Sequence, residues 1–88
     1  MKTSVLVKIT NACGNEQRLE MLKFLRNKKY ATVSSVSKNI NLSVKSTSKH
    51  LQILHAAHIV KREREGVEIY YSLNRPLNDV MKVIIGIL

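Results

Sequence analysis

Residues 42–57 read LSVKSTSKHLQILHAA, a run without glycine or proline. Ser43 suits an N-cap, because its hydroxyl can accept a hydrogen bond from a free N–H of the first helical turn, so we predict a helix over 43–57. At helical spacing, one side of this helix carries Val44, Thr47, Ser48, Leu51, Leu54 and His58. The opposite side is short, polar and basic, and it carries Lys45, Ser46, Lys49, Gln52 and Ala56.

The polar side of this helix has two interpretations. Lys45 lies in the first turn, where the helix dipole disfavours a cation by roughly 0.3–1 kcal/mol. Its presence there favours a phosphate or base partner. The alternative is a solvated helix face that carries two lysines and binds nothing. The choice between them depends on what surrounds the helix.

The segment before this helix predicts a second, shorter helix over residues 32–40. It begins near Thr32 or Val33, and Val36 and Ile40 are four residues apart on its buried side. A turn centred on Asn41 joins it to the longer helix. A short helix, a tight turn and a longer helix with basic outward residues form the helix-turn-helix pattern.

Further upstream, residues 15–27 predict a helix. It begins at Asn15, and Leu19, Leu22 and Leu25 form its apolar stripe. Residues 1–14 form an N-terminal segment whose alternating valines fit a strand as well as a helix. We favour a short helix there.

Downstream, residues 59–73 alternate around Gly66 and predict a β-hairpin, the wing of a winged helix-turn-helix. Residues 76–88 predict a last helix with Pro76 in its first turn. This helix is apolar on nearly every side, so it must be covered, and a second copy of the chain is the expected cover. The expected dimer interface is Leu77, Val80, Met81, Val83, Ile84, Ile87 and Leu88. The fold class is therefore mainly α with a small β-hairpin, one winged helix-turn-helix domain over 1–88 that dimerises through its terminal helices.

Composition narrows the function. The 88 residues carry a net charge of +9, which favours polyanions as partners. No acidic residue occurs between Glu20 and Glu63, and nine Lys and Arg residues lie in that gap. Double-stranded DNA is the first expected partner and an anionic membrane a distant second, because the apolar residues have the spacing of a packed core. No stretch is apolar enough for a spanning helix or a signal peptide, so a cytoplasmic location is expected.

Several residues across the chain match the pattern of a known protein family. Arg18, Met21-Leu22, Ser48-Lys49-His50-Leu51, Ile59-Val60, Gly66 and Tyr71 together resemble the ArsR/SmtB winged helix-turn-helix repressors. The resemblance implies a homodimeric repressor that places its recognition helix in the major groove of an operator, and many family members respond to metals, thiol oxidation or other ligands. Two features depart from the family. His58 stands where a glycine is usual, and the region 33–39 lacks the Cys-x-Cys pair of metal sensors while the last helix offers only Asp79 as a ligand. No metal or small-molecule effector is evident.

The expected contacts to DNA divide into three groups. Hydroxyls and an amide suit base edges and lysines suit guanine or phosphate, so the major-groove candidates are Ser43, Lys45, Ser46, Thr47, Lys49 and Gln52. The backbone candidates are Lys38 before the helix and Lys61, Arg62 and Arg64 on the wing. His50 lies at the edge of this face, where the resemblance implies a contact or a packing role. The wing also carries Glu63, Glu65 and Glu68, so ion pairing with glutamate is the alternative role of its arginines.

Other chemistries find less support in the sequence. His50, His55 and His58 form a cluster in which His55 and His58, three residues apart, could both reach one ion, but no Cys or carboxylate stands near them by spacing. Cys13 is either a small buried residue or a thiol that forms an intersubunit disulfide or senses redox state. No catalytic set or phosphate-binding glycine loop is present, so neither an enzyme nor a bound cofactor is expected. The rival functions are a nonspecific architectural nucleic-acid binder and a winged-helix module that binds protein.

Overall fold

The computed structural model describes all 88 residues. Its helices are α1 (Thr3–Cys13), α2 (Glu16–Arg26), α3 (Val33–Ile40), α4 (Val44–Ala56) and α5 (Asp79–Ile87). Its strands are β1 (Ala31–Thr32), β2 (Val60–Glu65) and β3 (Glu68–Leu73).

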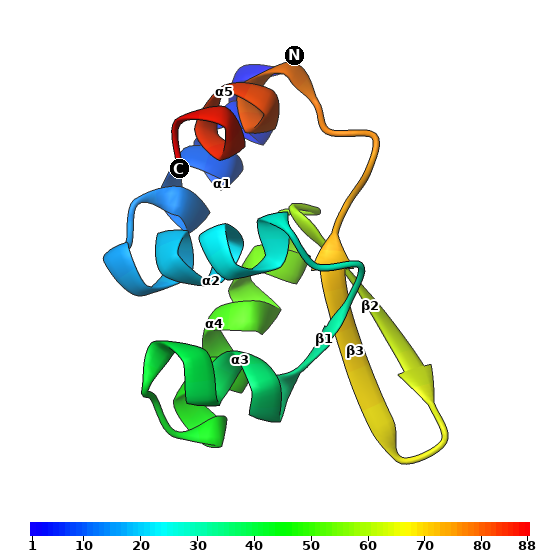
Figure 1. Ribbon diagram of the computed structural model, residues 1–88. Coiled ribbons are helices and arrows are strands. Elements are labelled where there is room, and N and C mark those ends of the chain that lie inside the picture. The colour runs from blue at the N-terminus through cyan, green and yellow to red at the C-terminus, as the bar shows by residue number, and fades with distance from the viewer.

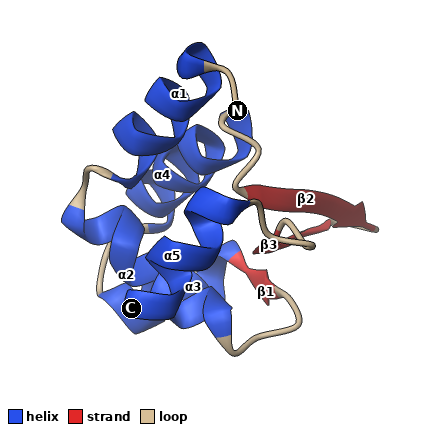
Figure 2. Ribbon diagram, turned by 90° about the horizontal axis from the view of Figure 1, so that it is seen from above, coloured by secondary structure: helices blue, strands red, loops and turns tan.

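The helices and the sheet divide the molecule into two ends. α1 and α5 lie together at the top of Figure 1, whereas α3 and the start of α4 lie at the bottom. The view from above in Figure 2 shows the β2–β3 hairpin projecting to one side of the helices. The outward faces of α3 and α4 and the tip of the hairpin are thus separated from the helices that carry the two chain termini. This arrangement is the predicted winged helix-turn-helix fold.

A backbone turn and a side-chain hydrogen bond set the angle between α3 and α4. Asn41 adopts the left-handed conformation, with φ of 57°, which turns the chain sharply after α3. The buried hydroxyl of Ser37 donates to the carbonyl of Leu42 at 2.9 Å and closes the turn. α4 then begins at its expected N-cap, because the backbone N–H of Ser46 donates to Ser43 Oγ at 3.0 Å.

The end of α4 explains the histidine that departs from the family pattern. His58 has φ of 59°, in the left-handed region that favours glycine. Its N–H donates to the carbonyl of His55 at 2.9 Å, and the N–H of Ile59 donates to the carbonyl of Leu54 at 3.0 Å. These are the two bonds of a Schellman motif, so the helix ends with the geometry of a glycine cap although the residue is histidine.

The sheet has the strand order β1-β3-β2, with both pairs antiparallel. The hairpin lies within the predicted range, and β1 is an addition that the sequence did not suggest, because a strand of 2 residues shows no periodicity. The β2–β3 register places Arg62 opposite Tyr71 and Glu63 opposite Tyr70. Because directly opposed residues share a face, the wing arginines lie on the face of the buried Tyr71 and the glutamates on the other.

One hydrophobic core joins all the elements. Its 16 buried side chains come from every helix and from the sheet, and include Ile9, Leu22, Val36, Leu51, Tyr71 and Met81. α5 begins later than predicted, at Asp79, because the side chain of Asn78 accepts from the N–H of Met81 at 2.9 Å and acts as the N-cap. None of these helices has the length and hydropathy to cross a bilayer.

Candidate nucleic-acid interface

The outward face of α4 is polar and accessible. Lys45, Ser46, Lys49 and Gln52 are all exposed, and Gln52 Nε2 donates to Ser48 Oγ at 3.2 Å. Val44 was expected on the buried side, but it is 52% exposed because it occupies the first position of the helix, beyond the edge of the core. α4 therefore presents two cations and several hydrogen-bonding groups along one stripe, as a helix that enters a major groove requires.

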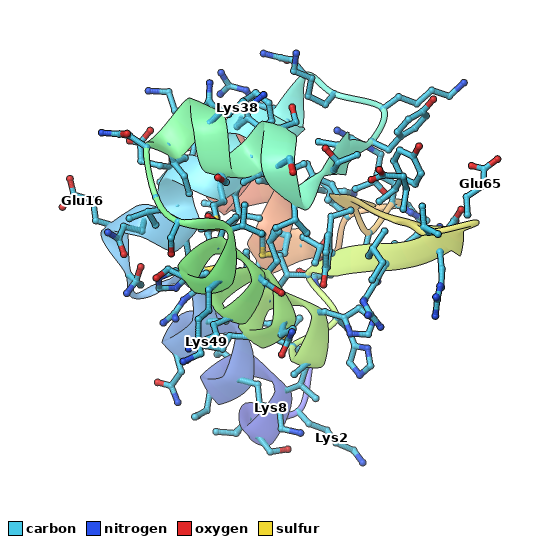
Figure 3. All side chains as sticks on the ribbon, turned by 90° about the horizontal axis from the view of Figure 1, so that it is seen from below. Lys2, Lys8, Glu16, Lys38, Lys49 and Glu65 are labelled. Carbon is cyan, nitrogen blue, oxygen red and sulfur yellow. The ribbon has the colours of Figure 1, made fainter.

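The charged side chains of α3 and α4 are all basic. Figure 3 looks at the molecule from below, where Lys38 on α3 and Lys49 on α4 appear on the near face. Neither α3 nor α4 contains an acidic residue. Ser43, at the N-cap of α4, is exposed beside them. This surface, formed by the outward residues of α3 and α4, is named the basic face below.

Thr47 does not belong to the basic face. Helical spacing placed it on the buried side, while its hydroxyl made it a candidate for base contact, and the structure decides between these predictions. Thr47 is 0% exposed and its Oγ1 has no hydrogen-bond partner. The prediction that Thr47 approaches DNA is therefore wrong, because its side chain lies on the side of α4 that faces the core.

Thr47→Val is expected to stabilise the protein by about 1 kcal/mol, because it replaces a buried hydroxyl without a partner by a methyl group. For a domain of this size, that corresponds to a rise in Tm of about 4–8 °C. Thermal unfolding followed by circular dichroism checks this. A fall in Tm would show that the hydroxyl is in fact satisfied.

His50 makes its contact inside the molecule. Its Nδ1 lies 3.3 Å from Arg18 Nη1, and its side chain is half-buried. Arg18 Nε donates to the carbonyl of Ala12 at 2.7 Å, so this arginine joins the end of α1 to α4. Burial lowers the pKa of the His50 imidazole, and the neighbouring Arg18 guanidinium lowers this pKa further. Of the two roles that the resemblance implied for His50, the structure shows packing.

The lowered pKa of His50 predicts a pH dependence of stability. A histidine whose pKa falls on folding favours the neutral form of the native state, so its contribution is fully present above the unfolded pKa of about 6.5. The contribution is lost as the pH falls through the folded pKa. His50→Gln is therefore expected to reduce the difference in the free energy of unfolding between pH 7.5 and pH 5.5, measured by urea denaturation. His55→Gln, an exposed histidine on the same helix, is the control; equal pH slopes for the two variants would contradict the role of His50.

The wing presents its basic residues at the surface. Lys61, Arg62 and Arg64 are exposed, and Arg64 Nε donates to the carbonyl of Gly66 at 3.2 Å. The cross-strand partners of Arg62 and Arg64 are Tyr71 and Ile69 rather than glutamates. Glu65 lies at the far end of the hairpin in Figure 3. The arginines are thus separated by the sheet from the acidic residues that precede and follow them.

The proposed dimer residues on α5 fall into three classes of exposure. Val83 and Ile87 are 64% and 79% exposed. The half-buried members are Leu77, Val80, Ile84 and Leu88. Met81 is 2% exposed inside the chain's own core, so its assignment to a dimer interface is wrong. Part of the apolar surface of α5 packs on α2, so only the remaining part is accessible to a partner.

α1 contributes exposed apolar side chains that the sequence analysis did not assign to an interface. Val5 and Val7 are 42% and 48% exposed. α1 and α5 lie at the same end of the molecule in Figure 1, and a groove of about 280 Å³ runs between Thr10 and Cys13 on α1 and Ile84 on α5. In the sequence, these exposed residues could have been found only from the alternating valines of residues 1–14, which fit a strand as well as a helix.

Cys13 lies in the core near this groove, 7% exposed. Burial raises the pKa of its thiol, and the Arg18 guanidinium offsets only part of that rise. The thiol form is therefore favoured at neutral pH, which makes the side chain a weak nucleophile. No group of three or more His, Cys, Asp or Glu side chains comes together elsewhere in the structure, and His50, His55 and His58 form no such group.

Comparisons with known proteins agree with this geometry. The family model described as bacterial regulatory protein, arsR family, matches residues 15–62. The transcriptional repressor SdpR of Bacillus subtilis is 42% identical over 43 residues, which is 49% of this chain and 48% of SdpR. The transcriptional repressor PagR of Bacillus anthracis is 32% identical over 63 residues, which is 72% of this chain and 63% of PagR. The chain thus matches less than two thirds of the length of either curated relative.

Two solved structures share the fold. The crystal structure of PagR superimposes with a TM-score of 0.81 and 26% identity, covering 97% of this chain and 94% of that chain. The homodimeric winged helix-turn-helix DNA-binding domain of Mb0332 from Mycobacterium bovis superimposes with a TM-score of 0.82 and 23% identity, covering 96% of this chain and 75% of that chain. The family model covers the helix-turn-helix and the start of the wing, where the basic face lies. The chain belongs to the ArsR family of bacterial regulatory proteins.

Proposed function

We propose that this protein is a homodimeric transcriptional repressor that binds a specific sequence of double-stranded DNA through the basic face. The observation that carries the proposal is the composition of α4. Its outward stripe combines Lys45 and Lys49 with Ser46 and Gln52, and no carboxylate lies on α3 or α4. Amide and hydroxyl groups discriminate base edges, whereas lysines supply attraction to phosphate.

The proposed contacts fall into two groups, those to base edges in the major groove and those to the phosphate backbone beside it. Ser43, Lys45, Ser46, Lys49 and Gln52 enter the major groove. Lys38 holds the backbone on one side of α4, and Lys61, Arg62 and Arg64 hold it on the wing side. His50 supports α4 from within through its contact with Arg18.

The homodimer is supported by the exposed apolar side chains on α1 and α5. Val83 and Ile87 on α5, with Val5 and Val7 on α1, would stay in water in a monomer. Mb0332, which shares the fold, is described as homodimeric, and PagR and SdpR are described as transcriptional repressors. A two-fold pair of this chain would place two α4 helices on successive turns of one face of DNA, about 34 Å apart.

Lys45→Ala and Gln52→Ala test the orientation of α4. Gln52→Ala is expected to weaken binding to an operator selected from random DNA by about 1–3 kcal/mol and to relax the preference at one base position. Lys45→Ala is expected to weaken binding to every sequence and to reduce the slope of log affinity against log salt by about 1. Fluorescence anisotropy with labelled operator measures both effects.

A matched control is Lys2→Ala, since Lys2 is an exposed lysine at the N-terminal end, away from α3 and α4. It should leave both the affinity and the salt slope almost unchanged. Unchanged affinity for both Lys45→Ala and Gln52→Ala would show that another surface of the protein contacts DNA.

A further inference from the structure

A hollow of about 390 Å³ lies between α1, the start of α2 and the C-terminal half of α4. This volume is within the range of small-molecule sites. The hollow lies at the C-terminal end of α4, and its lining includes none of Lys45, Ser46, Lys49 and Gln52. Nothing in the proposed function uses it.

The floor of the hollow is apolar. It is formed by Ala12 on α1 and by Ile53, Ala56 and Ala57 at the end of α4. Ile53 is 44% exposed, although its neighbours Leu51 and Leu54 are completely buried. A half-exposed isoleucine beside three alanines offers a surface that gains from contact with a hydrocarbon.

The rim of the hollow is positively charged. Arg18 and Lys8 both line it, and no acidic residue does. Arg18 is half-buried, yet its hydrogen-bond partners are all neutral: the carbonyls of Ala12 and Asn11, and the ring of His50. A guanidinium stays charged at any physiological pH, so its charge is not balanced within the chain.

We propose that this hollow binds a small carboxylate with an apolar tail, its head group on Arg18 and Lys8 and its tail on Ile53, Ala56 and Ala57. A planar carboxylate matches the fork geometry of a guanidinium. A single negative charge suits a site with two cations and an apolar floor, whereas a bare phosphate would leave the floor empty.

The position of the hollow gives such a ligand a route to the recognition helix. Arg18 contacts the end of α1 and, through His50, α4. A carboxylate that draws the guanidinium toward the hollow competes with these contacts. By thermodynamic reciprocity, a change in operator affinity caused by the ligand must equal the change in ligand affinity caused by the operator.

The first test uses the protein without DNA, so its outcome is independent of the proposed function. Octanoate is titrated into ¹⁵N-labelled protein, with octylamine as the probe of opposite charge. Saturable shifts are expected at the amides of Asn11, Ala12, Ala56 and Ala57, with a Kd of about 0.1–1 mM for octanoate and much weaker binding of octylamine. Equal shifts with both probes would show an apolar hollow without charge selection and would overturn the proposal, as would shifts that do not saturate.

Charge-reversed variants then locate the site. Lys8→Glu is expected to weaken octanoate binding at least about threefold, because an exposed attraction becomes a repulsion. Lys82→Glu makes the same change in net charge on α5, away from the hollow, and should leave the Kd unchanged. Because Lys8 and Lys82 are both exposed, both variants should fold, as their circular dichroism checks. Equal loss in the two variants would mean that octanoate responds to overall charge only, and would refute the site.

Discussion

Replacing Val83 and Ile87 together by glutamate is expected to convert the proposed dimer into a monomer and to lower operator affinity by about 10²–10⁴-fold. Both side chains project from α5, 64% and 79% exposed, and neither belongs to the core. Two glutamates on this face would have to be buried against their copies in a two-fold interface, where like charges repel. The monomer then loses the gain from binding two half-sites with one molecule, which is the source of the large factor.

Sedimentation velocity measures the assembly, and anisotropy with the operator measures the binding. The fold should survive, because Met81 and Ile85, which anchor α5 in the core, are unchanged. Lys82→Glu is the control, because Lys82 is an exposed position on the same helix, directly before Val83 in sequence. A double variant that still sediments as a dimer would place the interface elsewhere.

Leu51→Ala is expected to destabilise the protein by about 2–5 kcal/mol, which is a large fraction of the stability of a domain of this size. Leu51 is 0% exposed and packs α4 against the rest of the core. A cavity at this position is not easily filled, because the core side chains of α4 and α2, such as Leu54 and Leu22, are themselves fully buried. The expected fall in Tm is more than about 10 °C.

Ile53→Ala is the matched control for Leu51→Ala. It removes an aliphatic side chain of similar size two positions along the same helix, but Ile53 is 44% exposed. Its cost should be about 1 kcal/mol or less. Urea denaturation of both variants checks the difference, and similar losses would show that α4 is rotated from the orientation described.

The sequence predicts α4 well because several independent signals coincide there. Ser43 caps it, Leu51 and Leu54 face the core, and Lys45 and Lys49 face water, as the spacing required. The spacing fails at Val44, and at Thr47 the spacing is right but the assignment of its hydroxyl to DNA is wrong. Val44 lies in the first turn, beyond the edge of the core, and Thr47 is small enough to be buried despite its hydroxyl. A periodic count gives the direction of a side chain but does not show where the neighbouring elements end.

The role of Arg18 could not be predicted from the sequence. It was recognised only as part of a family pattern, whereas the structure brings it to the carbonyl of Ala12 and to the ring of His50. These partners lie 6 and 32 positions away in the chain, so no local pattern relates them. Contacts of this kind depend on how α1, α2 and α4 pack together.

The same limit applies to β1 and to the start of α5. β1 consists of 2 residues, and it is a strand only because β3 lies beside it. For α5, the sequence predicted a start at Pro76, whereas the side chain of Asn78 makes the capping bond and the helix begins at Asp79. Pro76 suits a first helical turn by its fixed φ, but the hydrogen bond from the N–H of Met81 to the Asn78 side chain is what marks the observed start.

The central claim is that the basic face reads a DNA sequence. The most direct measurement is a selection of bound DNA from a random pool, followed by anisotropy with the selected sequence and with random DNA of equal length at the same salt concentration. We predict at least about a 10³-fold preference for the selected sequence, carried by two similar half-sites one helical turn apart. Equal affinity for selected and random DNA would contradict the claim and would identify the protein as a nonspecific binder.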